Sequence, residues 1–434
     1  MDIEYLKSII IMRQQEFPVS LIERENPLPM DYKRIITVPG IRRCGKSSKM
    51  ELVVNSLLEK GIPKENILWI GFDDERLLSM KMENLDSIIQ SYRELFPQIE
   101  LSKVYFFFDE IQLIEGWEFF VLRIFKHYSK HIYVSGSNAS MLSAELKSSL
   151  RGWADDYETY PLSFKEYCRF KGVDYLSYHE KDRALVKNAF KKYNNEGGFP
   201  EPVLTENSFQ KLRLLQGYFD TMLLKDLAEH YGISNIEVLR YFLKRIMENI
   251  TKPTSIRNIH NDIKSRGLKV SKDNLYEWIN HACEIFMFLR IPNYSRSLQK
   301  IENSQPKYYC IDNGLRDAVL LPQSNDDCKK LENTVFLELK RRMMPSDKIY
   351  YFQGKTECDF VIQKGINIES LIQVSWNIKE QETREREIKG LLEASETTGC
   401  QNLLIITVDS EGKIIVDDKV IKVIPAWKWI LSLS

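Results

Sequence analysis

The chain has 434 residues, of which 43% are apolar and 28% are charged. This composition is typical of a globular protein, and the length predicts about two to four domains rather than one core. Lys plus Arg and Asp plus Glu both number 61, so no overall basic field favours nucleic acid as a partner.

Cysteine usage and hydropathy narrow the cellular location. The seven cysteines are scattered and include no Cys-x-x-Cys pair, which indicates reduced thiols and argues against a structural zinc. Asp2 and Glu4 open the chain without the long apolar core of a signal peptide. No run of about 20 apolar residues predicts a membrane span. We therefore expect a cytoplasmic protein without a membrane partner.

A phosphate-loop pattern follows a predicted helix and an irregular arm in the first 30 residues. The apolar β-type run Ile35, Ile36 and Val38 leads into residues 40–47, Gly-Ile-Arg-Arg-Cys-Gly-Lys-Ser, and an amphipathic helix comes next. The segment matches G-x-x-x-x-G-K-[ST]. A chance match is the alternative, and the flanking strand and helix argue against it.

The chemistry of nucleotide binding explains this spacing. Gly40 and Gly45 let the backbone curl so that successive N–H groups point at phosphate oxygens. Lys46 is expected to reach the β- and γ-phosphates as a catalytic residue, and the Ser47 hydroxyl to take one Mg²⁺ position. We expect the whole loop to contact ATP, that is, Gly40, Ile41, Arg42, Arg43, Cys44, Gly45, Lys46, Ser47 and Ser48.

A carboxylate pair ends the third predicted strand. Strands near 66–72 and 103–112 are apolar on both faces and alternate with helices near 85–96 and 117–127, which predicts a parallel sheet covered on both sides. Asp109 and Glu110 therefore lie at a carboxyl-end strand tip beside the phosphate loop. Asp109 is expected to hold Mg²⁺, and Glu110 to polarise the attacking water as general base. An ordinary solvated acidic turn is the alternative.

Four segments carry a resemblance to a known family: residues 40–47, 72–77, 108–112 and 135–139. They resemble a widespread prokaryotic AAA-superfamily ATPase family whose members carry a C-terminal domain with a nuclease-like fold and no settled function. Further matches at 160–167, 197–201 and 225–226 extend the resemblance over nearly the whole chain. The family often has Leu-x-Gly-Arg where this chain reads Leu-Arg-Gly-Trp at 150–153. An arginine finger is therefore not assigned there, although Arg151 is close; a surface charge is the alternative.

The resemblance also implies a residue that senses the γ-phosphate at the tip of the fourth strand, residues 132–138. Asn138 fits this catalytic role better than Ser137 because an amide both donates and accepts hydrogen bonds. The alternative is that Asn138 or Ser140 caps a helix over residues 141–150. Residues 161–250 read as helices near 164–170, 181–193, 209–231 and 236–249, which resembles the helical lid that follows an AAA core.

Residues 251–327 predict a winged-helix pattern. Ser255 and Ser271 are expected to cap two helices, and two strands near 285–292 and 307–311 follow with a polar loop between them. From 252 to 300 the chain has nine Lys or Arg against four Asp or Glu. DNA contact would use Lys269, Lys272, Arg296 and Lys300. The alternative, which we favour, is a protein-packing module, because the presumed recognition helix carries Asp273, Glu277 and Trp278.

Residues 328–434 predict a third globular unit with a helix near 331–342, strands near 349–352, 357–363, 371–375, 403–408 and 420–424, and a helix near 383–394. The order Glu332, Asp359, Gln373 resembles a restriction-endonuclease-like core, in which such residues hold Mg²⁺ and a lysine activates water. Ser375 stands where that lysine belongs. We therefore expect the fold without cleavage, with Asp359 kept as a structural hydrogen-bond acceptor.

Together these patterns predict an α/β protein of four parts: residues 1–160, an AAA-type P-loop ATPase core with an N-terminal helix; 161–250, a helical lid; 251–327, a winged-helix-like domain; and 328–434, an inactive nuclease-like domain. The expected function is Mg²⁺-dependent ATP hydrolysis that drives domain rearrangement, with an unknown protein client and possible homo-oligomers. The alternatives are a slow nucleotide-gated adaptor and an ATP-dependent nucleic-acid-processing protein.

Overall fold

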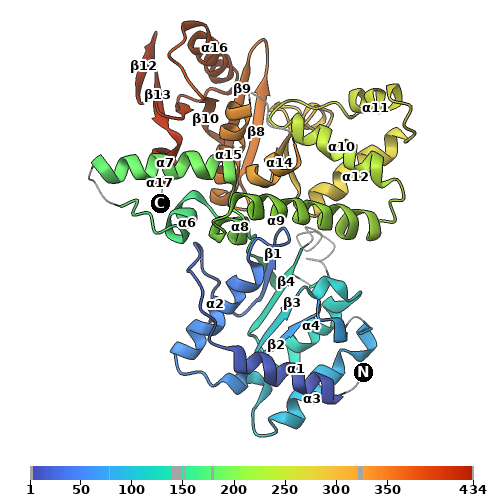
Figure 1. Ribbon diagram of the computed structural model, residues 1–434. Coiled ribbons are helices and arrows are strands. Elements are labelled where there is room, and N and C mark those ends of the chain that lie inside the picture. The colour runs from blue at the N-terminus through green and yellow to red at the C-terminus, as the bar shows by residue number, and fades with distance from the viewer. Residues whose placement is uncertain are drawn as a thin grey trace. The chain divides into compact units, whose positions relative to one another are not determined.

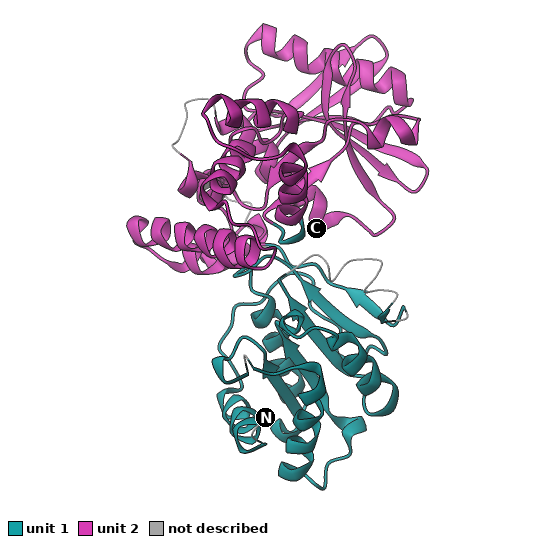
Figure 2. Cartoon of the chain, turned by 90° about the vertical axis from the view of Figure 1, so that its right-hand side faces the viewer, with its two compact units in different colours: residues 1–160, 284–286 teal, residues 161–283, 287–434 magenta. Residues whose placement is uncertain are grey.

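The computed structural model describes residues 3–77, 79–137, 149–150, 152–176, 180–320 and 326–432, and the side chains of 180 and 181 are not described. The chain forms two compact units. Unit 1 comprises Met1–Tyr160 and Glu284–Phe286, and unit 2 comprises Pro161–Cys283 and Met287–Ser434 (Figure 2). Among the described residues, no helix is long and apolar enough to cross a membrane.

Unit 1 contains a five-stranded parallel sheet in the order β2-β3-β4-β1-β5 (Figure 1). Every residue of β1, β3 and β4 is buried, which confirms the predicted sheet of strands that are apolar on both faces. The strands are β1 Ile35–Pro39, β2 Ile67–Gly71, β3 Tyr105–Asp109, β4 Ile132–Gly136 and β5 Ala154–Asp156; the longer helices are α1 Ile3–Glu16, α2 Lys46–Glu59, α3 Asp86–Leu95 and α4 Trp117–His127; single 3-10 turns are η1 Lys64–Asn66, η2 Glu75–Leu77, η3 Met82–Asn84, η4 Leu101–Lys103 and η5 Ile111–Leu113.

Alternation along β3 divides the core of unit 1 into two layers. Phe106 and Phe108 point to the face that α1, α3 and α4 cover, and Phe107 points to the opposite face with α2 and the N-terminal arm. On the α2 face, the Phe107 ring stacks between Trp69 and Tyr133, with centroid distances of 5.3 and 4.6 Å. This packing fixes the strand tips from which the candidate site is built.

The first part of unit 2 is helical, as expected. A capping box starts α6, in which the Ser163 hydroxyl accepts from the Glu166 N–H and the Glu166 carboxylate accepts in return. The predicted single helix over 209–231 is instead an α-helix followed by a π-helix. Its buried residues are five apart, Met222 with Leu227 and Leu223 with Ala228, a spacing that suits the wider π turn. The elements are α6 Phe164–Phe170, α7 Glu180–Glu196, α8 Pro200–Leu204, α9 Ser208–Thr221, η7 Met222–Glu229 and α10 Ile236–Glu248.

The middle of unit 2 has two helices followed by an antiparallel strand pair. Ser255 and Ser271 accept hydrogen bonds from the backbone N–H groups of Asn258 and Asn274, at 3.4 and 3.0 Å, so both predicted caps are present. A short helix occupies the loop that the sequence predicted to be irregular. The elements are α11 Ile256–Ser265, α12 Lys272–Glu284, β6 Phe288–Ile291, α13 Leu298–Glu302, β7 Lys307–Cys310 and α14 Asn313–Val319.

The last part of unit 2 has a six-stranded mixed sheet in the order β12-β13-β11-β10-β9-β8. β8, β9 and β10 are antiparallel, whereas β10, β11 and β13 are parallel. The sequence analysis missed β12 and α17. The elements are α15 Asp326–Arg342, β8 Lys348–Gln353, β9 Glu357–Lys364, β10 Asn367–Ser375, α16 Gln381–Thr398, β11 Leu403–Thr407, β12 Gly412–Val416, β13 Lys419–Pro425 and α17 Ala426–Ser432.

Candidate nucleotide site

The loop between β1 and α2 is held in one shape by close backbone contacts. Gly40 forms a parallel bridge with Thr159, and a Cβ at Gly40 would lie 2.1 Å from the Thr159 carbonyl oxygen. Gly45 has a φ of 98°, which a side chain would disfavour. Arg43 also has a positive φ, of 67°. Both glycines of the motif are therefore required by the geometry of the loop itself.

Lys46, the first residue of α2, points into a polar cluster beside the strand tips. Its side chain is 3% exposed, and its ammonium lies 3.1 Å from the Glu110 carboxylate. It also donates to the Ser137 hydroxyl at 2.9 Å and to the Ile41 carbonyl at 3.3 Å. The lysine thus joins the loop to the tips of β3 and β4.

The two carboxylates at the tip of β3 are oriented by serines of β4 and its end. The Ser135 hydroxyl donates to Asp109 and accepts from the Glu110 backbone N–H at 3.0 Å. The Ser137 hydroxyl lies 2.8 Å from both Glu110 carboxylate oxygens. Glu110 itself has a left-handed backbone, with a φ of 52°, which turns its side chain back toward the loop. Strand order therefore brings these groups together.

The charge states follow from burial and pairing. Burial opposes ionisation of Glu110, but Lys46 together with hydrogen bonds from Gln112 and Ser137 outweighs burial and lowers the pKa of Glu110 to about 2. Burial likewise opposes the charge on Lys46, and the Glu110 carboxylate keeps the pKa of that ammonium above its ordinary value. Burial raises the pKa of Asp109, against hydrogen bonds from Ser135 and Ser47. Glu110 is thus an anion and Lys46 a cation at neutral pH.

The two groups expected to bind Mg²⁺ are neighbours, since the Ser47 hydroxyl hydrogen-bonds to Asp109. One hydroxyl and one carboxylate suit a magnesium site that takes its other ligands from phosphate and water. Within the described ranges, no group of three or more His, Cys, Asp or Glu side chains is arranged to hold a metal by itself. The donor set present fits a metal that arrives with a nucleotide.

Other predicted loop residues contribute backbone rather than side chain. Ile41 and Cys44 are fully buried, and the Cys44 thiol donates to the Thr159 carbonyl at 3.2 Å. Burial raises the pKa of this thiol, so it is not a nucleophile. Asn138 and Arg151, proposed as sensor and as possible finger, lie outside the described residues.

Three contributors were missed by the sequence analysis. The Arg24 guanidinium, from the N-terminal arm, donates to the Cys44 and Tyr160 carbonyls, each at 2.9 Å, and so fastens the loop. The Gln112 amide donates to Glu110 at 2.6 Å. Ser135 was not considered. Gln112 and Ser135 lie within the motifs at 108–112 and 135–139, so the sequence held a signal for both, whereas it held none for Arg24.

The residues predicted for a nuclease-like centre converge in unit 2. Glu332 and Asp359 each contact the ammonium of Lys307, at 3.2 and 3.3 Å, and the Asp359 backbone N–H donates to the Gln373 side chain at 3.1 Å. Asp359 is a hydrogen-bond acceptor, as expected. Ser375 stands where the motif would have its lysine, as expected, but β7 supplies another lysine, Lys307, which the sequence analysis did not consider. Lys307 lies far from Asp359 in the sequence, so the local pattern around Asp359 and Gln373 did not indicate it.

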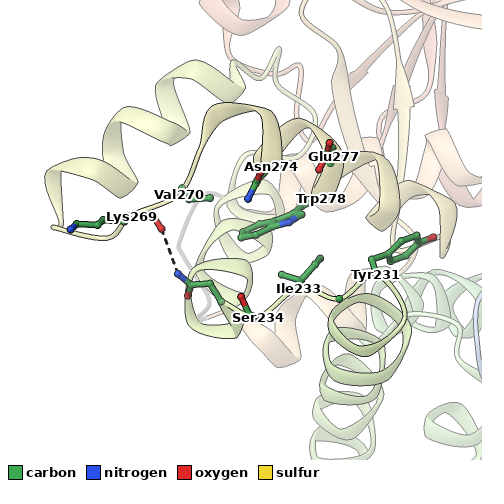
Figure 3. A pocket seen from close by; sticks show the side chains of 10 residues that line it. Tyr231, Ile233, Ser234, Lys269, Val270, Asn274, Glu277 and Trp278 are labelled. Atoms are coloured by element: carbon green, nitrogen blue, oxygen red, sulfur yellow. Dashed lines mark hydrogen bonds between the residues drawn. The ribbon is translucent and has the colours of Figure 1, made fainter.

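The segment predicted for DNA contact faces a pocket of about 410 Å³. The pocket lies between the turn after η7 and the start of α12, and Figure 3 shows Asn274, Glu277 and Trp278 on its α12 side. The Lys269 carbonyl accepts from the Asn235 amide at 3.5 Å across it. Trp278 is 5% exposed and packs edge-on against Phe242. Trp278 therefore lies on the buried face of α12, whereas Lys272, Asp273 and Glu277 on the same helix are exposed.

Fold and site together define a P-loop protein of the AAA type. A family model described as an AAA domain matches residues 32–168, and a model of a domain of unknown function matches residues 187–326. These matches confirm the AAA-type core that the motifs predicted.

Relatives extend over nearly the whole chain. An uncharacterised protein of Methanocaldococcus jannaschii is 32% identical over 424 residues, covering 95% of this chain and 91% of that protein. An uncharacterised protein of Haemophilus influenzae is 30% identical over 367 residues, covering 83% of this chain and 88% of that protein. The chain belongs to the family of AAA-domain proteins that these two represent.

Among solved structures, AMPPCP-bound DnaA from Aquifex aeolicus matches 64% of this chain and 86% of its own, at 14% identity and a TM-score of 0.28. Aeropyrum pernix ORC1 in complex with DNA matches 73% of this chain and 90% of its own chain, at 11% identity and a TM-score of 0.28. Both likenesses are distant.

Proposed function

We propose that the protein binds ATP with Mg²⁺ at the loop of residues 40–48 and hydrolyses it. The observation that carries this proposal is the contact of the Lys46 ammonium with Glu110 and Ser137 beside Asp109 and Ser47. A loop lysine, a metal-binding pair and an ionised carboxylate are the groups that phosphoryl transfer to water needs.

ATP binding changes the partner of Lys46 in this proposal. Phosphate oxygens take the place of Glu110 against the ammonium, and the loop N–H groups hold the remaining oxygens. Ser47 and Asp109 would hold Mg²⁺, which would neutralise charge on the phosphates. Glu110, released from Lys46 but still held by Ser137 and Gln112, accepts the proton of the attacking water. Asn138 is proposed to sense the γ-phosphate.

Equilibrium binding of a fluorescent ATP analogue tests the first step. Lys46→Met keeps the length of the side chain and removes its charge, which should weaken binding about 10-fold or more, because a charge-assisted hydrogen bond contributes about 1.5–3 kcal/mol. The exposed Lys60 at the end of α2 gives the matched control, Lys60→Met. Equal affinities for wild type, Lys46→Met and Lys60→Met would contradict the proposal.

A slow nucleotide-gated adaptor is the second candidate, and one observation favours it. The Lys46–Glu110 ion pair is nearly buried, and in this proposal it must separate before ATP is hydrolysed. A slow separation of the pair would keep the protein in its ion-paired state and make turnover slow. In either case hydrolysis or binding is proposed to rearrange the other domains on behalf of a protein client. A homo-oligomer is compatible with both.

For unit 2 we propose a lid at 161–250, a winged-helix-like module at 251–327 and an inactive nuclease-like domain at 328–434. The order of two helices, β6 and β7 supports the second. The order α15, antiparallel β8-β9-β10, α16 and parallel β11 supports the third. DNA is not the favoured partner, because the exposed residues of α12 include the carboxylates Asp273 and Glu277, which phosphate would repel.

A further inference from the structure

Lys307 is a fully buried lysine at the start of β7, surrounded by carboxylates. Its side chain is 0% exposed, and its ammonium lies 3.2 Å from Glu332, 3.3 Å from Asp359 and 2.5 Å from Glu357. Glu332 lies on α15, and Glu357 and Asp359 lie on β9, so α15, β9 and β7 meet at the Lys307 ammonium. The Tyr351 ring, 5.4 Å away, covers the ammonium from β8. We call these residues the Lys307 centre.

The polar atoms around the Lys307 centre already have partners. The Tyr309 hydroxyl donates to Glu332 at 2.9 Å, and the Val374 N–H donates to the second oxygen of Asp359 at 2.8 Å. The Gln373 side-chain carbonyl accepts a hydrogen bond from the Asp359 N–H, and its amide NH₂ donates one to the Glu387 carboxylate. Both carboxylate oxygens of Asp359, one of Glu332 and the side-chain carbonyl of Gln373 therefore already accept hydrogen bonds or contact Lys307.

We propose that the Lys307 ammonium is the resident cation of this centre, in the place where a metal-dependent site built from the same residue types holds a divalent ion. Buried carboxylates require a counter-charge in close contact, and a lysine supplied by the chain provides it without a metal. Glu332 and Asp359 are 7% and 6% exposed, so an external cation has little access to them.

The charge balance agrees with this geometry. One ammonium faces the two buried carboxylates of Glu332 and Asp359 and the partly exposed carboxylate of Glu357. Burial raises the pKa of Asp359 well above its ordinary value, with Glu332 adding to it, and burial also raises the pKa of Glu332. Both shifts show that burial disfavours two ionised carboxylates side by side, and the Lys307 ammonium is the cation in direct contact with this pair.

A live nuclease is the rival interpretation, with Lys307 as the water-activating lysine that Ser375 does not provide. That interpretation requires a metal ion between Glu332 and Asp359 and a phosphodiester beside Lys307. The ammonium itself occupies the space between the two carboxylates, and its side chain is inaccessible to solvent. Lys307 also fastens the β6–β7 pair onto α15 and β9, a structural role.

Binding of Mn²⁺ to the full-length protein without nucleotide, followed by electron paramagnetic resonance, tests the proposal. Asp359→Asn should leave the Mn²⁺ stoichiometry of the wild type unchanged. Lys307→Ala should gain one ion per chain, and Lys307→Ala combined with Asp359→Asn should lose it. Lys211→Ala, which breaks an ion pair with Glu196 alone, should gain none. The P-loop contribution is common to all variants and cancels.

Two results would overturn the proposal. One is Mn²⁺ bound by the wild type and lost in Asp359→Asn. The other is a folded Lys307→Ala protein that gains no Mn²⁺. If Lys307→Ala does not fold, the comparison of wild type with Asp359→Asn decides alone, since equal binding supports the proposal and unequal binding refutes it.

Discussion

At the residue scale, single charged groups are set by partners from distant parts of the sequence. Lys46 and Glu110 are 64 positions apart, and each holds the charge of the other against burial. The residue types at both positions were predictable, because P-loop chemistry demands them at the loop and at a strand tip. The double contact of Ser137 was not, since it depends on where β4 ends relative to β3.

Asp312 predicts a pH dependence of stability. This fully buried carboxylate accepts from the Gly198 and Leu315 backbone N–H groups at 2.6 and 2.8 Å, and burial, despite these bonds, raises its pKa to about 6 from an ordinary 3.8. The folded state therefore binds this proton more tightly than the unfolded state. The resulting stability is present below about pH 4 and is lost as pH rises through about 6.

Urea unfolding between pH 4 and 7 measures this contribution. We expect a loss of about 3 kcal/mol from Asp312 across that range, because each pKa unit corresponds to about 1.4 kcal/mol. Asp312→Asn should abolish that part of the pH slope while lowering stability throughout, since an amide cannot accept from both N–H groups. An unchanged slope in Asp312→Asn would show that this carboxylate does not carry the effect.

At the element scale, the Gly-Gly-Phe-Pro segment between α7 and α8 is explained by a close approach. Gly197 has a φ of 76°, and a Cβ there would lie 2.1 Å from the Asp312 carboxylate, just before α14. A Cβ at Gly198 would lie 2.4 Å from the Leu162 carbonyl. Close packing therefore explains why glycines stand at both positions of this segment.

Replacement of Gly197 by Ala should destabilise the protein by about 2–4 kcal/mol, from backbone strain and the displaced carboxylate. Gly217 in the exposed face of α9 is the matched control, because its Cβ would meet open space. Gly217→Ala should stabilise by about 0.5–1 kcal/mol through helix propensity. Thermal midpoints measure both; equal shifts for the two variants would refute the packing argument.

The elements that the sequence predicted well are those with a strong apolar period or a cap. α4 and α6 begin and end at the predicted residues, and the strands of unit 1 have continuous apolar runs. The sequence did not predict β12, because only Ile414 of its five residues is buried and the strand has no apolar alternation. α17 escaped because seven residues are too few to establish a period, although Ala426, Trp429 and Ile430 share its buried face.

The Lys307 centre shows what sequence reasoning could not reach. Glu332, Asp359 and Gln373 were recognised as a pattern, but the lysine that joins them precedes the predicted domain. Its role depends on how the β6–β7 pair packs against α15 and β9, which no local periodicity encodes. A lysine at a strand start is ordinary in sequence and becomes informative only by its complete burial.

At the scale of the whole molecule, DNA binding by the α11–α12 region is the clearest negative expectation. In fluorescence anisotropy with duplex DNA at 150 mM salt, about physiological ionic strength, we expect no saturable binding in the micromolar range. Charge reversal at Lys269 and Lys272 should leave the DNA affinity and its salt dependence unchanged. If these lysines did contact phosphates, charge reversal would lower both measurably. A salt-dependent affinity that collapses in that double variant would contradict this expectation.

We propose that the AAA-type core of this chain hydrolyses ATP with Glu110 as the general base. ATP turnover with Mg²⁺, measured for wild type and Glu110→Gln alongside nucleotide affinity, tests it most directly. Glu110→Gln keeps the shape and the contact with Ser137, so ATP affinity should stay within a few-fold of wild type. Turnover should fall about 100-fold or more, the usual contribution of a general base. Hydrolysis at the wild-type rate by Glu110→Gln, or no hydrolysis by a wild type that binds ATP, would contradict the claim.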